Sequence, residues 1–324
     1  MNGKDPAPGR DDRHWAELGE RGTVLGFRIL STLHALLGPW ISRLVLVPVV
    51  AYFFITHPQA RRASRRYLER VQPYSQRAGS GGPRPSRFNV WRHFWRFAVA
   101  NLDMFAAWRA PAKVRLEFRE RERFSAALQG GRGLLLLSAH LGNLELTRAL
   151  ATQLLGLKIN ALVYTQHAVK SNQVLEEINE AYTLRLIQVS QIGTDTALLL
   201  RDKIESGEVV VIVGDRTPVS AQSQVTHADF LGKPAPFAVG PYVLAHVLEC
   251  PVYLFFCVEE DGVYSVHLEP FAERIHLPRR ERREALQALA SRYAARLADY
   301  AARYPLQWYN FYDFWAERPG TPGD

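Results

Sequence analysis

The longest apolar stretch of the chain covers residues 23–56 and predicts a helical segment. Arg28, His34 and Arg43 interrupt it, and its longest clean run, residues 44–56, is shorter than the roughly 18 residues that a membrane-spanning helix needs. Gly38-Pro39 divides the stretch into two pieces, which indicates a hairpin or an interfacial element lying in one leaflet. The alternative is a buried helical pair of a soluble domain.

The flanks of this stretch indicate how it is oriented. Residues 1–22 form a polar tail that carries Glu17 and Glu20 in place of the basic start of a signal peptide, so the segment is expected to stay on the mature protein. Arginines at 61, 62, 65, 66 and 70 follow it, and anionic lipid on a cytoplasmic face attracts such a basic cluster. We therefore expect a tail at 1–22, a membrane anchor at 23–57 and a catalytic domain at 58–324. The alternative for the arginines is a solvated helix face.

Downstream the periodicity alternates between strands and helices. A Gly/Pro/Ser-rich linker at 77–87 precedes an aromatic helix, and from residue 133 onward apolar runs predict strands at 134–138, 161–164, 186–189, 209–213, 252–258 and 264–268. Helices are expected at 194–204, 238–248 and 282–303, the last with one apolar stripe. This order indicates an α/β sandwich with a mostly buried central sheet.

Composition narrows the choice of partners only in part. Forty Lys and Arg against 32 Asp and Glu give a net charge of +8, which favours anionic partners. The aromatic residues of the basic segment 87–96 have the spacing of a packed helix, so we expect no nucleic acid as partner. Cys250 and Cys257 share an apolar run without CxxC spacing or a nearby histidine pair, which argues against a disulfide framework or a metal site.

The strongest chemical signal is a histidine directly after the strand at 134–138. His140 is followed by a turn with Gly142 and Asn143 and then by Glu145 at a helix start. In that arrangement Glu145 can reach back to His140, fix its tautomer and make it a better base. We also expect the backbone N–H groups near Gly142 and Asn143 to hold an oxyanion. The spacing alone is weak, because a lone histidine near a strand end is more often structural.

Two further segments carry candidate substrate contacts. The strand at 209–213 ends in Gly-Asp-Arg, where Arg216 is suited to a bidentate grip on an anionic group and Asp215 to orienting it. A purely structural Asp215–Arg216 pair is the alternative. In the segment 230–236, Gly232 and two prolines are expected to shape a turn before a helix.

Taken together, these segments resemble the glycerolipid and lipid A acyltransferase superfamily, in its branch that acylates lipid A and related glycolipids. The resemblance covers roughly residues 20–316 and is carried by SAHLGNLEL at 138–146, Gly-Asp-Arg at 214–216, DFLGKPAPFAVGP at 229–241 and Gln-Trp-Tyr at 307–309. In one departure, the last motif continues as NFYDFW, where lipid A enzymes tend to have a Trp and a basic residue. That departure concerns the acceptor and leaves the acyl-transfer chemistry untouched.

The resemblance implies a function for these residues. It makes His140 and Glu145 the catalytic pair, and Asn143, Asp215, Arg216 and Gly232 substrate contacts, with Gly232 beside the acyl channel. It implies transfer from acyl carrier protein or acyl-CoA to a lipid or glycolipid hydroxyl, without cofactor, at the cytoplasmic face of a bacterial inner membrane. The sequence contains no GxSxG, HExxH, Walker A or GxGxxG motif. The remaining alternative is a non-catalytic membrane scaffold that retains the fold.

Overall fold

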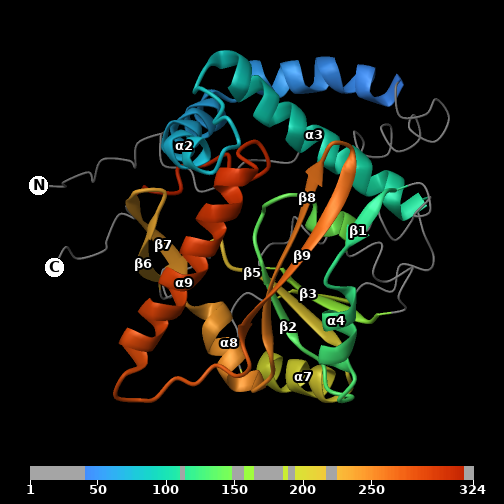
Figure 1. Cartoon of the computed structure of the whole chain (residues 1–324), viewed down its shortest axis with the longest axis vertical. Coiled ribbons are helices and arrows are strands. Elements are labelled where there is room, and N and C mark those ends of the chain that lie inside the picture. The colour runs from blue at the N-terminus through green and yellow to red at the C-terminus, as the bar shows by residue number, and fades with distance from the viewer. Residues whose placement is uncertain are drawn as a thin grey trace, which may run out of the picture.

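A computed structural model describes residues 41–109, 114–147, 157–163, 185–188, 194–216 and 225–316. The predicted polar tail, the first part of the apolar stretch and its Gly38-Pro39 break lie outside the described residues. The core of the described structure is a seven-stranded sheet of order β1-β9-β8-β2-β5-β3-β4 (Figure 1). Its strands are β1 (Leu116–Phe118), β2 (Leu135–Ser138), β3 (Ile159–Val163), β4 (Arg185–Gln188), β5 (Val209–Val213), β8 (Val252–Glu260) and β9 (Val263–Ala272).

Most neighbouring strands of this sheet are parallel. Strands β8 and β9 form an antiparallel hairpin, whereas the other neighbouring strands of this sheet pair in parallel. All six predicted strands are present, and the predicted bounds of β5 match. The missed strand of this sheet, β1, is three residues long, too short to show a periodicity.

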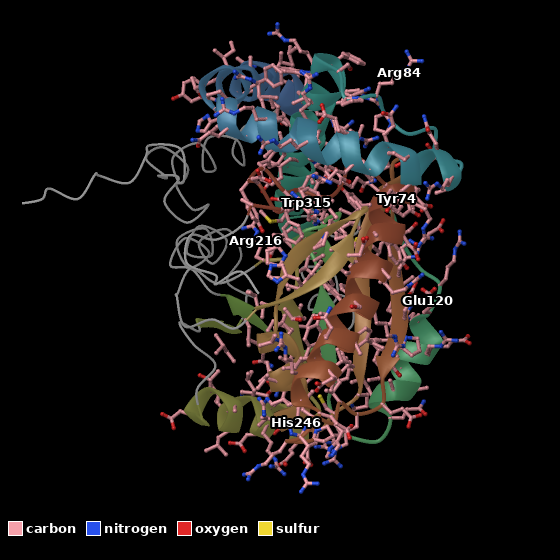
Figure 2. The ribbon with its side chains drawn as sticks, turned by 90° about the vertical axis from the view of Figure 1, so that its left-hand side faces the viewer. Tyr74, Arg84, Glu120, Arg216, His246 and Trp315 are labelled. Carbon is pink, nitrogen blue, oxygen red and sulfur yellow. The ribbon has the colours of Figure 1, made fainter. Side chains whose placement is uncertain are left out.

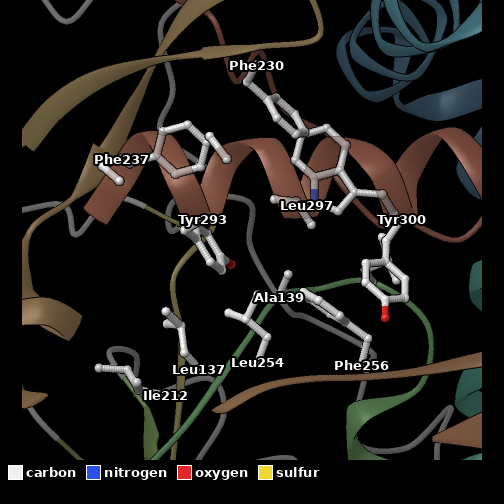
Figure 3. Packing of buried hydrophobic residues seen from close by; sticks show 14 of the residues in the cluster. Leu137, Ala139, Ile212, Phe230, Phe237, Leu254, Phe256, Tyr293, Leu297 and Tyr300 are labelled. Carbon is white, nitrogen blue, oxygen red and sulfur yellow. The ribbon is translucent and has the colours of Figure 1, made fainter. Parts of the chain in front are cut away.

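Side chains along the sheet enter two separate cores in alternation. Leu135 and Leu137 of β2 pack in one core, whereas Leu134 and Leu136 pack in the other. Helix α9 (Arg282–Arg303) closes the first core, where Tyr293 faces the sheet (Figure 3). Helix α4 (Arg121–Leu128) contributes to the second. Because both faces are covered, the strands read as continuous apolar runs, and the expected α/β sandwich with a mostly buried central sheet is observed.

The remaining helices group at the two ends of the sheet. Helices α2 (Pro58–Arg77) and α3 (Arg87–Arg109) lie together at one end, and α7 (Thr194–Glu205) and α8 (Gly240–Leu248) at the other (Figure 1). The predicted linker at 77–87 is the short connection between α2 and α3. The three predicted helices correspond to α7, α8 and α9, and the predicted bounds of α9 match.

The turn predicted at 230–236 is present at Gly232, but the two prolines lie in a strand of a β-hairpin that was not predicted. Strands β6 (Val225–Phe230) and β7 (Lys233–Ala238) pair antiparallel, with Leu231 and Gly232 at positive φ in the turn. Pro234 and Pro236 stand two residues apart, so both occupy positions of β7 where a backbone N–H would point away from β6. The lack of an N–H in proline therefore costs no hydrogen bond between the two strands. The two prolines, expected in a turn, are therefore compatible with an edge strand.

The helix Ile41–Thr56 is attached to α3 by a narrow apolar face. Leu46 packs with Val99 and Leu102 of α3, whereas Leu44 and Ile55 are each 70% exposed. No single helix of the described part is long and apolar enough to cross a membrane. Ile41–Thr56 and Pro58–Arg77 pass that test only as a pair, bent by 92°. The predicted interfacial placement of this segment stays a prediction.

Candidate active site

His140 and Asp215 meet at the edge where two parallel strands end. Strands β2 and β5 are parallel neighbours that end with Ser138 opposite Val213. The residues two positions beyond the end of each strand, His140 and Asp215, therefore lie side by side. The His140 Nδ1 atom lies 2.8 Å from Asp215 Oδ1, and the backbone N–H of His140 donates to Asp215 Oδ2 over 2.8 Å. The local topology therefore brings a histidine and a carboxylate together from residues 75 positions apart.

The electrostatics of this pair favour a neutral imidazole beside an ionised carboxylate. Burial and the Arg216 charge lower the pKa of His140 and outweigh Asp215, which raises it. Burial raises the pKa of Asp215, but the charge of His140 and its hydrogen bonds outweigh it, so the net pKa of this carboxyl is lowered. A carboxylate can only accept, so Nδ1 carries the proton and Nε2 keeps a lone pair. The His140 side chain is 31% exposed, whereas that of Asp215 is 2% exposed.

This geometry corrects the expected partner of His140. The carboxylate on Nδ1 is supplied by Asp215, not by Glu145, because the end of β5 lies directly beside the end of β2. Glu145 is half-buried near the start of the helical residues 144–147, and its negative charge raises the pKa of His140 less than Asp215 does. Its catalytic role stays a prediction.

Arg216 follows Asp215 at the rim of this edge. The Asp215 carboxylate bonds to His140, and its expected role in orienting Arg216 stays a prediction. The positive charge of Arg216 lowers the pKa of both His140 and Asp215, which places it within electrostatic reach of the pair. Figure 2 shows Arg216 at mid-height of the molecule, between Arg84 at one end and His246 at the other. Its expected contact with an anionic substrate group stays a prediction.

The expected oxyanion donors in the following turn are already occupied. The N–H of Gly142 donates to the carbonyl of Gln307 over 2.8 Å, and the N–H of Asn143 donates to the carbonyl of Cys257 over 2.7 Å. Gly142 has φ 73°, and a Cβ there would overlap the Cys257 carbonyl. Both N–H groups are used in hydrogen bonds that connect the turn to Gln307 and Cys257, so the prediction that they hold an oxyanion was wrong.

Asn143 and Gly232, both expected to contact substrate, have identifiable structural partners. Asn143 caps the helical residues 144–147, since its Oδ1 accepts from the N–H of Leu146 over 3.0 Å, and its Nδ2 donates to the carbonyl of Ala100 over 2.7 Å. Gly232 turns the β6–β7 hairpin, where an added Cβ would lie 3.1 Å from the hydroxyl of Tyr74. Their substrate contacts stay predictions.

Sequence reasoning missed the part that residues 308–312 play in this site. The indole N–H of Trp308 donates to Asp215 Oδ2 over 2.9 Å, and the backbone N–H of Tyr309 donates to the carbonyl of His140 over 2.7 Å. The hydroxyl of Tyr312 donates to the carbonyl of Asp215 over 3.3 Å. Gln-Trp-Tyr at 307–309 was noticed as a motif, but nothing in the sequence connects it to the ends of β2 and β5.

The sequence model of one protein family matches residues 86–316, and that family is described as bacterial lipid A biosynthesis acyltransferase. The matched range contains the His140–Asp215 pair, the β6–β7 hairpin and the segment 308–312. No curated protein matches the chain.

Proposed function

The chain belongs to the bacterial lipid A biosynthesis acyltransferase family, since the match covers well over half of its length, and on this premise we propose that His140 is the general base of its acyl transfer. Family membership makes the protein an acyltransferase that acts on lipid. The observation that carries the proposal is the hydrogen bond between His140 Nδ1 and the buried Asp215 carboxylate. It leaves Nε2 as the proton acceptor on the partly exposed side chain.

The proposed reaction is a direct transfer. His140 Nε2 removes the proton of an acceptor hydroxyl while the oxygen attacks the thioester carbonyl, and collapse of the tetrahedral intermediate expels the carrier thiolate, which takes up a proton. Asp215 stabilises the imidazolium that forms, and the nearby charge of Glu145 acts in the same direction. The reaction needs neither a covalent enzyme intermediate nor a metal ion.

We propose that Arg216 binds an anionic group of a substrate. The group is an anionic part of the acceptor or of the acyl donor, and a guanidinium grips a phosphate through two parallel bonds. The electrostatic effect of Arg216 on His140 supports this role, because it places the guanidinium near the proposed base. The acceptor is a lipid or glycolipid hydroxyl.

We further propose that the protein attaches to the cytoplasmic face of the inner membrane without spanning it. The exposed apolar residues of the helix Ile41–Thr56 support this, and Phe88 and Phe97 of α3 add two exposed aromatic rings. Arg65 and other basic residues of α2 follow directly in the chain, where they suit contact with anionic head groups.

The test of acyl transfer uses purified full-length protein with an acyl-carrier-protein thioester or acyl-CoA and a bacterial lipid extract. We expect time-dependent thiol release and an acylated lipid in the mass spectrum, and a rate lower by about 10²–10⁴ in His140→Ala. Equal thiol release by His140→Ala and the wild type would rule out this mechanism. An absence of transfer with either donor would favour the non-catalytic scaffold.

A further inference from the structure

The carboxylate of Asp215 accepts three N–H groups, and they are divided unevenly between its two oxygens. Oδ1 faces His140 Nδ1, whereas Oδ2 accepts the backbone N–H of His140 and the indole N–H of Trp308. The Trp308 side chain is completely buried. Its indole N–H is therefore a side-chain donor that reaches this carboxylate from the interior of the protein.

The division between the oxygens fixes the rotation of the carboxylate. Two donors converge on Oδ2, and any turn of the carboxylate plane breaks both bonds while it moves Oδ1 away from Nδ1. Hydrogen bonds to a charged acceptor are stronger than neutral ones, and a buried N–H left without its acceptor is costly. Loss of the indole N–H would thus loosen the orientation of Asp215 and raise its pKa toward the value that burial alone favours.

We propose that Trp308 is a positioning residue for the catalytic base: it holds the Asp215 carboxylate in the rotation that keeps the proton of His140 on Nδ1. This inference rests on the proposed function of His140. Trp308 contacts no reacting atom and acts only through Asp215.

The indole itself is set in place from the α2–α3 end of the molecule. His93 of α3 lies with Nε2 2.9 Å from the carbonyl of Trp308 and Nδ1 2.8 Å from the hydroxyl of Ser64 on α2. The carbonyl can only accept, so Nε2 donates to it and Ser64 donates to Nδ1. The ring of Tyr67 packs at 4.9 Å from the Trp308 ring. Helices α2 and α3 are therefore connected to His140 through Ser64, His93, Trp308 and Asp215.

The structure offers a matched control for this role. Trp315 is a second buried indole, with its ring 6.2 Å from that of Trp308, and its N–H donates to the carbonyl of Phe230 over 3.1 Å. Trp308→Phe and Trp315→Phe remove the same atoms from the same aromatic cluster. Only Trp308→Phe removes a hydrogen bond from Asp215.

The experiment compares kcat, KM and the pH profile of thioester turnover in wild type, Trp308→Phe and Trp315→Phe. In Trp308→Phe we expect kcat to fall about 10- to 100-fold at unchanged KM, the range that corresponds to one hydrogen bond to a charged group. The acidic limb of the pH profile should move to lower pH, because a loosened Asp215 favours the imidazolium less. Trp315→Phe should keep the wild-type pH profile.

A second pair of variants tests the His93 connection. His93→Phe removes the donor to the Trp308 carbonyl, whereas His93→Gln can retain a donor at a similar reach. We expect His93→Phe to lower kcat in the same sense as Trp308→Phe and less strongly, and His93→Gln to recover part of the loss. The double variant Trp308→Phe/His93→Phe should lose less than the product of the two single losses, because both act on one carboxylate.

The possible outcomes separate the two proposals. If the wild type and Trp315→Phe transfer no acyl group, the proposed function fails. If they turn over and Trp308→Phe keeps the wild-type kcat and pH profile, the positioning role is overturned. If Trp308→Phe does not fold, benzothienylalanine at position 308, which replaces the indole N–H by sulfur in a ring of nearly the same shape, takes its place with the same two readouts.

Discussion

The substitution Asp215→Asn should remove the base function of His140 while leaving the shape of the site intact. Asparagine has the size of aspartate, but its amide offers one accepting oxygen and one donating nitrogen. The site presents three N–H groups, one to Oδ1 and two to Oδ2. The amide can satisfy only one of these two sides at a time.

The two orientations of the amide differ in cost. With its nitrogen toward Oδ2, the N–H groups of His140 and Trp308 both lose their acceptor, at about 1–3 kcal/mol for each buried donor. With its oxygen toward Oδ2, both bonds survive and the NH₂ group faces His140 Nδ1. That orientation is favoured, and it obliges Nδ1 to accept, which moves the ring proton to Nε2 and blocks the base. The expected loss in kcat is about 10²–10⁴, and the same exchange in a serine-protease triad costs about 10⁴.

The assay pairs kinetics with a direct observation of the proton. Single-turnover rates with acyl thioester give the loss, and the ¹⁵N shifts of the His140 ring distinguish a proton on Nδ1 from one on Nε2. We expect the Nδ1–H form in the wild type and the Nε2–H form in Asp215→Asn, at similar KM. Near wild-type turnover in Asp215→Asn, together with a 10²-fold or larger loss in Glu145→Gln, would show that Glu145 is the partner and would refute the reasoning.

Three further predictions concern Arg216, the apolar helix and His93. Arg216→Lys should raise KM for the anionic substrate more than it lowers kcat, and a lower melting temperature with unchanged kinetics would instead assign Arg216 a structural role. The double variant Leu44→Glu/Ile55→Glu should lower binding to anionic vesicles at least tenfold in a flotation assay. The control Leu198→Glu, on an exposed leucine of α7 at the other end of the molecule, should not. Burial lowers the pKa of His93 to about 4 from 6.5, so the unfolded state binds more protons between these values and stability falls as pH falls through that window. At about 1.4 kcal/mol for each pH unit, the free energy of unfolding falls by about 3 kcal/mol by pH 4. This pH-dependent loss of stability should be absent in His93→Gln when urea unfolding is measured at each pH.

Much of the fold could be predicted because strands that are buried on both faces of a sheet appear in the sequence as continuous apolar runs. Val209–Val213 is a continuous apolar run between a helix and a Gly-Asp-Arg turn, and its bounds follow directly. The β6–β7 hairpin was missed because Pro234 and Pro236 argue against a strand until the partner on one side is known. The order of strands in the sheet is a tertiary property, which the local pattern does not contain.

The same limit explains why His140 was found and its partner was not. Glu145 was the nearest carboxylate in sequence, and reasoning along the chain selected it. Asp215 follows its own buried strand just as His140 does, so both stood out, yet only the pairing of β2 with β5 shows that they meet. The role of Trp308 was harder to predict than that of Asp215. An indole in an aromatic segment is expected to lie in the core, and no local signal marks its N–H as bonded to a carboxylate.

The position of residues 307–312 in the chain sets the order in which the protein becomes competent during synthesis. Every described strand of the sheet precedes Gln307, so the sheet can form on the ribosome while Asp215 still lacks the indole N–H and the turn at Gly142 lacks the Gln307 carbonyl. The helix Ile41–Thr56 emerges before any of these strands. If this helix attaches to a lipid surface as proposed, attachment can precede the moment at which the base is assembled, and a nascent chain can be bound to lipid before it is able to transfer an acyl group.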